Sequence, residues 1–351
     1  MPAKFLFFIS RFLILLVLIK GGALAASAPE PDRTQRLIEG AKQEGELNIW
    51  SIGDMRAQNE LVEGFKRKYP FIKKVQAIRP QSFRTRNRLL AEARAGKASE
   101  VDVVGLISFD MVYVAENSLL MPYKSPETQA VAEGFRDANG HWTAFFVNPK
   151  VTAYNTNLVA ARDLPRKWED LLTPNWRGKI ALYREDYGWF SNFLKIAGRE
   201  RGLAFMRQLA RQDLQLRDGH TLMVQLLAAG EFPLISVAYA PRISLTKSEG
   251  APVDWVALDP VFGEAQSIAI YAKAKHPNAA KLYVDYVLSR EVQQEVWVNR
   301  YWKHSARPDV VAKDSRWKSI KVIPLDLMLT KELARTAEEF RQIFESKGGS
   351  K

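Results

Sequence analysis

The stretch VDVVGLIS, residues 101–108, decides the fold class because it is an apolar strand of the kind found inside parallel sheets. Upstream of it, segments with helical period alternate with strand-like segments. In chain order these are RTQRLIEGAKQEGE (33–46), LNIWSIG (47–53), QNELVEGFKRKYP (58–70), KKVQAIRP (73–80) and RTRNRLLAEARAGK (84–97). Alternation of helices and strands predicts an α/β domain.

Predicted strands and helices also alternate in the second half of the chain. The predicted strands are VTAYNT (151–156), GKIALY (178–183), FPLISVAY (232–239) and SIAIYA (267–272). The predicted helices are KWEDLL (167–172), RERGLAFMRQLAR (199–211), TLMVQLLAAGE (221–231) and HPNAAKLYVDYVLSREVQQE (276–295). No Pro-rich or Gly/Ser-rich linker separates the halves, so we expect two α/β lobes with short, ordered connections.

Composition limits the class of protein further. The chain has 351 residues, of which 47% are hydrophobic and 11% aromatic, and this suffices for about two domains with substantial cores. It contains no cysteine, which excludes disulfides, thiolate metal sites, cysteine nucleophiles and a lipid-modified cysteine anchor.

The N-terminus predicts export. A basic start, an apolar run over residues 12–19 and small residues around Ala25 are typical of a secretory signal peptide, which we assign to residues 1–26. Lys20 directly after the apolar run is atypical, so an uncleaved N-terminal anchor is the alternative. No later segment is apolar enough to span a membrane, and we expect the mature chain to work in the periplasm without stable membrane insertion.

The formal charge is +12, and removal of the three basic residues of the signal peptide leaves +9. A basic exported protein could bind nucleic acid, an anionic surface or acidic small molecules. No nucleic-acid module is present. The arginines at 84, 86, 88 and 94 indicate a solvated basic face or an anion site at a helix N-terminus.

Catalytic motifs are absent. The sequence contains no G-x-S-x-G, H-E-x-x-H, G-x-G-x-x-G or phosphate loop, and its four histidines have no metal-ligand spacing. The loops after the predicted strands are instead rich in Ser, Asp, Tyr and Arg: SIGDMR (51–56), RPQSFRTR (79–86), ISFD (107–110), YREDYGWF (183–190) and AYAPR (238–242). Ligands of open α/β sheets bind at such strand ends. We therefore expect a binding protein and no enzyme.

The order of segments resembles the extracellular solute-binding proteins of ABC importers, in the branch that includes the ferric-ion binders. The resemblance runs from about residue 33 to about residue 305. The segments that carry it include AKQEGELNIW, EARAGKASEVDVV, HWTAFFVNPKVTAYNTNLV, DLPRKWEDLLTPNWRGKIAL and HPNAAKLYVDYVLSREVQQE.

The resemblance implies a type II periplasmic binding fold, in which two α/β lobes around a central cleft are joined by two hinge crossings. The crossings are expected near FFVNPKVTAYNT (145–156) and GEAQSIAIY (263–271). The first lobe would comprise residues 30–145 and 265–351, and the second lobe residues 150–260. Closure of the lobes on a solute would be sensed by a membrane permease with its ATPase.

For the solute, the resemblance implies Fe(III) or a ferric-anion complex held by tyrosine phenolates, transported as ligand and not as a cofactor. Tyr239 is followed by Ala240, so the adjacent tyrosine pair common in ferric binders is missing; Tyr183 and Tyr187 are the substitute metal ligands. The complete expected ligand-binding set is Asp54, Arg84, Thr85, Ser108, Tyr183, Tyr187 and Tyr239.

The competing solute is a small organic anion such as a phosphonate or carboxylate. It follows if Arg56, Arg84, Arg184 and Arg242 face the cleft, because guanidinium groups match such anions. Two further alternatives are the effector domain of a transcription regulator, which would carry a DNA-binding module where the signal segment stands, and an exported enzyme. We expect a monomer that contacts no nucleic acid.

Overall fold

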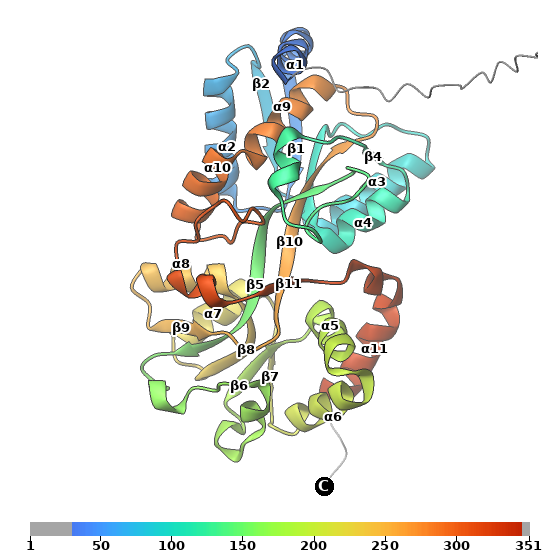
Figure 1. Cartoon of the computed structure of the whole chain (residues 1–351). Coiled ribbons are helices and arrows are strands. Elements are labelled where there is room, and N and C mark those ends of the chain that lie inside the picture. Colours follow the sequence, from blue (N-terminus) through green and yellow to red (C-terminus); the bar gives the residue numbers. More distant parts are fainter. Residues whose placement is uncertain (1–29, 346–351) are drawn as a thin grey trace, which may run out of the picture.

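The structure is a computed structural model that describes residues 30–345, and it has two α/β lobes, one above the other (Figure 1). The signal peptide expected at residues 1–26 lies outside the described residues. Within residues 30–345, no helix is long and apolar enough to cross a membrane.

The upper lobe in Figure 1 contains the N-terminal elements and part of the C-terminal half. They are α1 (Glu30–Glu44), β1 (Glu46–Ser51), α2 (Met55–Lys68), β2 (Lys74–Ile78), α3 (Ser82–Arg94), β3 (Val103–Ile107), α4 (Ser108–Glu116), β4 (Leu120–Met121), the 3-10 helix η1 (Pro126–Ala130), α9 (Pro277–Leu288), α10 (Arg290–Val292) and the π-helix η5 (Gln293–Arg300). β1 pairs in parallel with both β2 and β3.

Helix α9 shows how sequence and packing agree in this lobe. Pro277 starts the helix, and the Glu44 carboxylate accepts hydrogen bonds from the backbone N–H groups of Asn278 (3.0 Å) and Ala279 (2.8 Å). A carboxylate at a helix N-terminus satisfies unpaired N–H groups and interacts favourably with the helix dipole. The buried face of α9 joins α1 and α2 in one core around the fully buried Phe65.

The lower lobe is built from the middle of the chain (Figure 1). Its elements are β6 (Ile180–Tyr183), α5 (Tyr187–Ala197), α6 (Arg199–Ala210), β7 (Gln215–Arg217), α7 (His220–Ala228), β8 (Leu234–Tyr239), α8 (Ala240–Ser248) and β9 (Val253–Val256), together with the 3-10 helices η2 (Ala161–Asp163), η3 (Trp168–Leu172) and η4 (Pro174–Trp176). β6 pairs in parallel with both β7 and β8.

Two long strands join the lobes, β5 (Thr143–Asn155) and β10 (Val261–Tyr271). They pair antiparallel along residues 143–149 of β5, β10 pairs with β3 of the upper sheet, and β5 pairs with β8 of the lower sheet. The strand order is therefore β2-β1-β3-β10-β5-β8-β6-β7. This confirms the expected α/β fold with two crossings, which are the ribbons between the lobes in Figure 1.

The C-terminal segment returns along the crossings and ends on the lower lobe. Its elements are the 3-10 helix η6 (Ser315–Ser319), β11 (Val322–Pro324), the 3-10 helix η7 (Leu327–Glu332) and α11 (Leu333–Phe344). β11 pairs with β10, whereas α11 packs on α5 and α6. The fully buried ring of Phe340 meets that of Phe190 with centroids 5.5 Å apart.

The expected lobe division put everything from residue 265 to 351 in the first lobe. Because the apolar face of α11 is buried against α5 and α6, we propose that residues 333–344 belong with 150–260 in the second lobe. The resemblance ends near residue 305, so it carries no information on where this last helix packs.

Candidate functional site

The two crossing strands present a row of polar side chains at the level of the cleft. In the β5–β10 ladder Asn148 lies opposite Glu264, and side chains two residues apart share a face of a strand. Asn148 and Lys150 therefore share a face with Glu264 and Gln266. Polar residues inside otherwise apolar strands mark this face as the floor of a site, because buried polar groups are costly without partners.

Lys150 is the centre of this floor. Its side chain is only 3% exposed, and its Nζ lies 2.6 Å from Asp186 Oδ1 and 3.1 Å from Glu264 Oε2. Burial lowers the pKa of Lys150, but the two carboxylates outweigh it, so the pKa is raised and the ammonium stays charged. Asp186 keeps one buried carboxylate oxygen, Oδ2, without a hydrogen-bond partner.

Three aromatic rings form the second-lobe wall beside this floor. The His220 ring lies between Tyr183 and Tyr239, with centroid distances of 4.3 and 4.2 Å. Tyr183 ends β6, His220 starts α7 and Tyr239 ends β8, so three strand–helix junctions bring the rings together. This is the strand-end position at which open α/β sheets bind ligands.

The two tyrosine hydroxyls of this trio are engaged, and all three rings are uncharged at neutral pH. The Tyr239 hydroxyl donates to Glu264 Oε2 (2.8 Å), and the Tyr183 hydroxyl donates to Glu185 (3.0 Å). Burial, assisted by these carboxylates, raises the pKa of both phenols. Burial and the Lys150 ammonium lower the pKa of His220 to about 3, against a smaller opposing effect of Glu264.

Tyr187, the third expected metal ligand, lies elsewhere. It starts α5, where the sequence analysis expected a loop, and its ring meets Phe340 of α11 edge-on with centroids 5.4 Å apart. The position after Tyr239 is the buried Ala240. The structure therefore brings together Tyr183 and Tyr239 but not Tyr187.

Asp54 lies at the expected cleft loop and caps α2. Its carboxylate accepts from the N–H groups of Arg56 (2.8 Å) and Ala57 (3.4 Å). Arg84 is exposed on α3, with its guanidinium 5.9 Å from the ring of its neighbour Phe83. Of these two residues, Asp54 lines a cavity between the lobes and Arg84 is not among its lining residues.

Thr85 and Ser108 use their hydroxyls within the fold. Thr85 is 1% exposed and donates to the carbonyl of Gln81 (3.3 Å), and the buried Ser108 shares a hydrogen bond with Ser267 (2.7 Å). Ser108 thereby ties the start of α4 to the crossing strand β10. Both residues hold strand-end elements in place.

At the anion site suspected at the start of α3, one of the arginines already pairs with a carboxylate of the protein. Arg86 Nη1 lies 2.6 Å from Asp110 Oδ1, with Asp110 buried in α4. Burial raises the pKa of Asp110, although the Arg86 guanidinium acts in the opposite direction. Arg86 therefore already has an anionic partner.

A cavity of about 500 Å³ opens between the lobes. Its lining comes from the loop after β1, the start of α2, the end of η5 and helix α8, each of the last two with the residue that follows it: Asp54, Arg56, Arg242, Leu245, Glu249, Arg300 and Tyr301. Three arginines face two carboxylates in this lining. The Nε of Arg242 is buried without a hydrogen-bond partner, so its guanidinium retains a free donor.

Lys303 adds a further cation beside this cavity. Its Nζ donates to Asn148 of the floor (3.3 Å) and lies 4.6 Å from the centre of the Phe146 ring. Burial lowers the pKa of Lys303 to about 8, with Asp54 acting against this shift and Arg242 with it. Lys303 thus links the floor to the cavity, because it contacts Asn148 and is influenced by Asp54 and Arg242 of the cavity lining.

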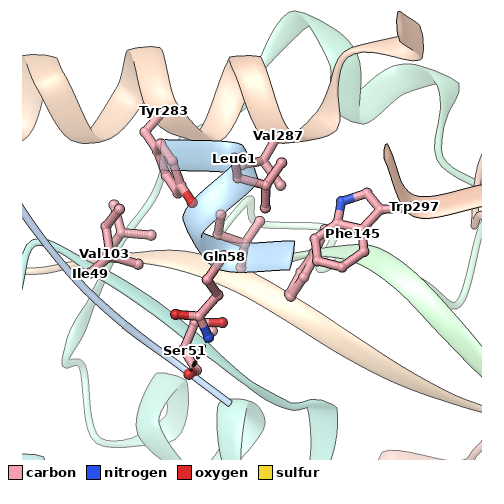
Figure 2. Close-up of a pocket in the computed structure, with 11 residues that line it drawn as sticks. Ile49, Ser51, Gln58, Leu61, Val103, Phe145, Tyr283, Val287 and Trp297 are labelled. Carbon is pink, nitrogen blue, oxygen red and sulfur yellow. Dashed lines mark hydrogen bonds between the residues drawn. The ribbon is translucent and has the colours of Figure 1, made fainter. Parts of the chain in front are cut away.

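A second, internal cavity of about 10 Å³ lies in the first lobe, and Figure 2 shows the residues around it. Gln58 lies beside Ser51 in this view, and its amide donates to the carbonyls of Ser51 (2.6 Å) and Gly53 (3.1 Å). The volume is that of about one water molecule. The cavity is too small for a solute, but Gln58 holds the loop that carries Asp54.

Several residues of the site were missed by the sequence analysis, above all Lys150, His220 and Glu264. The available signal was a charged residue inside each apolar crossing strand, FFVNPKVTAYNT and GEAQSIAIY. Of the arginines expected to face the cleft if the solute is an organic anion, Arg56 and Arg242 line the cavity. Arg184 instead lies 2.7 Å from Asp218 at the surface. Within residues 30–345, no three His, Asp or Glu residues are grouped so that they could hold a metal.

Two α/β lobes on crossing strands, with a polar cavity between them, define a solute-binding protein of the type II periplasmic class. Residues 109–331 match the family of bacterial extracellular solute-binding proteins, and the chain belongs to that family. This confirms three expectations from the sequence: the resemblance to extracellular solute-binding proteins, the type II periplasmic binding fold and the solute-binding function.

Two curated relatives are distant. An uncharacterised protein of Haemophilus influenzae is 26% identical over 196 residues, 52% of this chain and 56% of the relative, so the match spans about half the length of that protein. A protein of Serratia marcescens named Fe(3+)-binding periplasmic protein is 22% identical over 230 residues, 62% of this chain and 67% of the relative.

Solved structures share the fold at low identity. The periplasmic binding protein AfuA of Actinobacillus pleuropneumoniae, with exogenous fructose-6-phosphate bound, has a TM-score of 0.71 at 20% identity and covers 86% of this chain and 99% of its own. Iron-bound HitA of Pseudomonas aeruginosa has a TM-score of 0.71 at 17% identity, with coverage of 85% and 99%. Identities this low support the fold alone.

Proposed function

We propose that the protein is the periplasmic capture component of an ABC importer and that its solute is a small organic anion with a phosphate, phosphonate or carboxylate group. The observation that carries the choice of solute is Arg242, whose buried Nε has no partner on the wall of the interlobe cavity. A guanidinium binds such oxyanions through paired N–H donors, and a buried donor without a partner is costly until a ligand supplies one.

The cavity also explains how binding would favour closure. Arg56 and Arg300 come from the first lobe and Arg242 from the second. Arg300 also pairs with Glu60, so an anion between the lobes would chiefly bridge Arg56 and Arg242, and it does so best when the lobes are closed. A ligand shifts a conformational equilibrium by its differential affinity for the two states, so the anion would stabilise the closed state that a permease senses.

A ferric ion is the second candidate, because two phenols, a carboxylate and an imidazole meet in one cluster at Tyr183, Tyr239, Glu264 and His220. Phenolate and carboxylate oxygens suit a small trivalent cation. The names of the Serratia marcescens and Pseudomonas aeruginosa proteins point the same way. The buried Lys150 ammonium in the same cluster opposes a cation, and the geometry therefore supports the anion better.

The test is a solute screen on mature protein that has been stripped of ligand by unfolding and refolding. Phosphate monoesters, phosphonates, carboxylates and Fe(III)-citrate are compared by thermal shift and then by calorimetry, since a ligand of the folded state raises the melting temperature. We expect a shift with an organic anion and recovery of that anion unchanged, as befits capture without catalysis. Conversion to a product would refute the binding role.

The matched variants are Arg242→Gln and Arg211→Gln, which remove the same charge from the cavity wall and from the exposed end of α6. Loss of a hydrogen bond to a charged group corresponds to roughly 10- to 100-fold weaker binding, expected for Arg242→Gln alone. If only Fe(III) binds, with the visible colour of an iron–phenolate complex, the anion proposal is wrong and the second candidate holds. Light scattering of the stripped protein tests the expected monomer.

A further inference from the structure

The cluster of Tyr183, Asp186, His220, Tyr239 and Glu264 contains the kinds of donor atom that bind metals, but it also contains the lysine Lys150. Nζ of Lys150 and the Tyr239 hydroxyl both approach the same oxygen, Oε2 of Glu264, at 3.1 and 2.8 Å. The ammonium also lies 5.0 Å from the centre of the Tyr239 ring. The oxygens that would bind a metal are thus already grouped around a cation of the protein.

We propose that the Lys150 ammonium is a selectivity determinant, which offsets one of the two negative charges of Asp186 and Glu264 and excludes multivalent metal ions from the cluster. The inference rests on the proposed anion-binding function, because it explains how a site with two phenols and two carboxylates serves an anion. With the lysine, Asp186 and Glu264 leave a net charge of −1; without it, the net charge is −2.

Geometry makes the exclusion direct. A metal bound to Glu264 Oε2 at about 2 Å would lie at most roughly 5 Å from the ammonium, since Nζ is 3.1 Å from that oxygen. Like charges at such a separation in a buried site repel strongly. A solute anion experiences the opposite effect and is attracted by the same group.

The free oxygen of Asp186 supplies an independent observation. Oδ2 is buried without a partner, while Oδ1 is held by Lys150. Removal of the ammonium would leave Oδ2, Oδ1 and the oxygens of Glu264 without a cation in a buried place. Buried carboxylates require a countercharge. A variant without the ammonium would therefore favour a metal ion at this place, and Tyr239 and His220 could ligate it as well.

The experiment measures Fe(III) affinity by competition with nitrilotriacetate and records the iron–phenolate absorption. Lys150→Gln removes the charge but keeps an amide donor, and Lys150→Arg keeps the charge. Lys247→Gln is the matched control, because it breaks a second-lobe lysine pair with Asp254 (2.6 Å) outside the cluster. We expect Lys150→Gln to gain the absorption and at least about tenfold in Fe(III) affinity, whereas the other variants match the wild type.

Two results overturn the inference. One is a folded Lys150→Gln protein, verified by circular dichroism, whose Fe(III) affinity equals that of the wild type. The other needs no variant: a wild-type protein that takes Fe(III) from nitrilotriacetate with phenolate colour. Failure of the proposed function is distinct from both, because it is the absence of any organic anion that binds the wild type.

Discussion

Two partly buried histidines should make the ligand-free protein sensitive to mild acid. Burial, with help from the Lys150 ammonium, lowers the pKa of His220 to about 3, and burial lowers the pKa of His304 to about 4. His220 lies in the second-lobe aromatic trio, and the ring of His304 lies 5.0 Å from that of Trp317. In the unfolded chain both imidazoles have the ordinary pKa of 6.5.

The sign of the effect follows from proton binding. Because the folded pKa values lie below those of the unfolded chain, the unfolded state binds protons that the native state does not. The free energy of unfolding is therefore highest above pH 6.5 and falls as the pH drops toward 4. At pH 5, about 1.5 units below the unfolded pKa, each histidine has removed about 2 kcal/mol, and the two together about 4 kcal/mol.

The assay is urea unfolding of ligand-stripped protein at pH 7.5 and pH 5, followed by tryptophan fluorescence and circular dichroism. The wild type should lose about 4 kcal/mol of its free energy of unfolding, the single variants His220→Gln and His304→Gln about 2 kcal/mol each, and the double variant very little. A double variant that loses as much as the wild type would show that other groups control acid sensitivity and refute the reasoning.

Three further predictions concern stability, and urea unfolding at neutral pH checks each of them. Glu44→Gln removes the carboxylate that caps α9 and should cost about 1 kcal/mol. Phe65→Ala empties a fully buried site and should cost about 3–5 kcal/mol, whereas Phe83→Ala, at a ring 48% exposed, should be nearly neutral. Asp186→Asn breaks a buried pair and should cost about 3–5 kcal/mol, against under about 1 kcal/mol for Asp213→Asn in an exposed pair; equal losses would contradict the assigned burial.

Much of the scaffold could be predicted because its signals are local. The expected helix over residues 33–46 ends at Glu44 before Gly45, as α1, and Pro277 begins α9 as its position suggested. The expected strand VTAYNT, in contrast, is only the end of the 13-residue β5. A strand that leaves one sheet and enters another changes its partners along its length, and no local pattern records where it begins.

The structure brings only some of the expected site residues together. Tyr183 and Tyr239 were chosen as strand-end tyrosines, and the structure brings them together around His220. Tyr187 was chosen for the same reason, but α5 starts at that residue and turns its ring toward Phe340. Which side a residue faces after a strand ends depends on the helix that follows and on what packs against it.

The sequence by itself determined the fold class, the family and the absence of familiar catalytic motifs, because periodicity, helix-terminating residues and segment order are properties of neighbouring residues. Only the tertiary structure decided the chemistry of the cleft. Lys150 and Glu264 lie in different strands, Asp186 in a third segment, and they meet only because the two crossings pair and the second lobe packs against them. Charge in a buried site depends on which side chains share it, and that is set by packing between segments distant in the sequence.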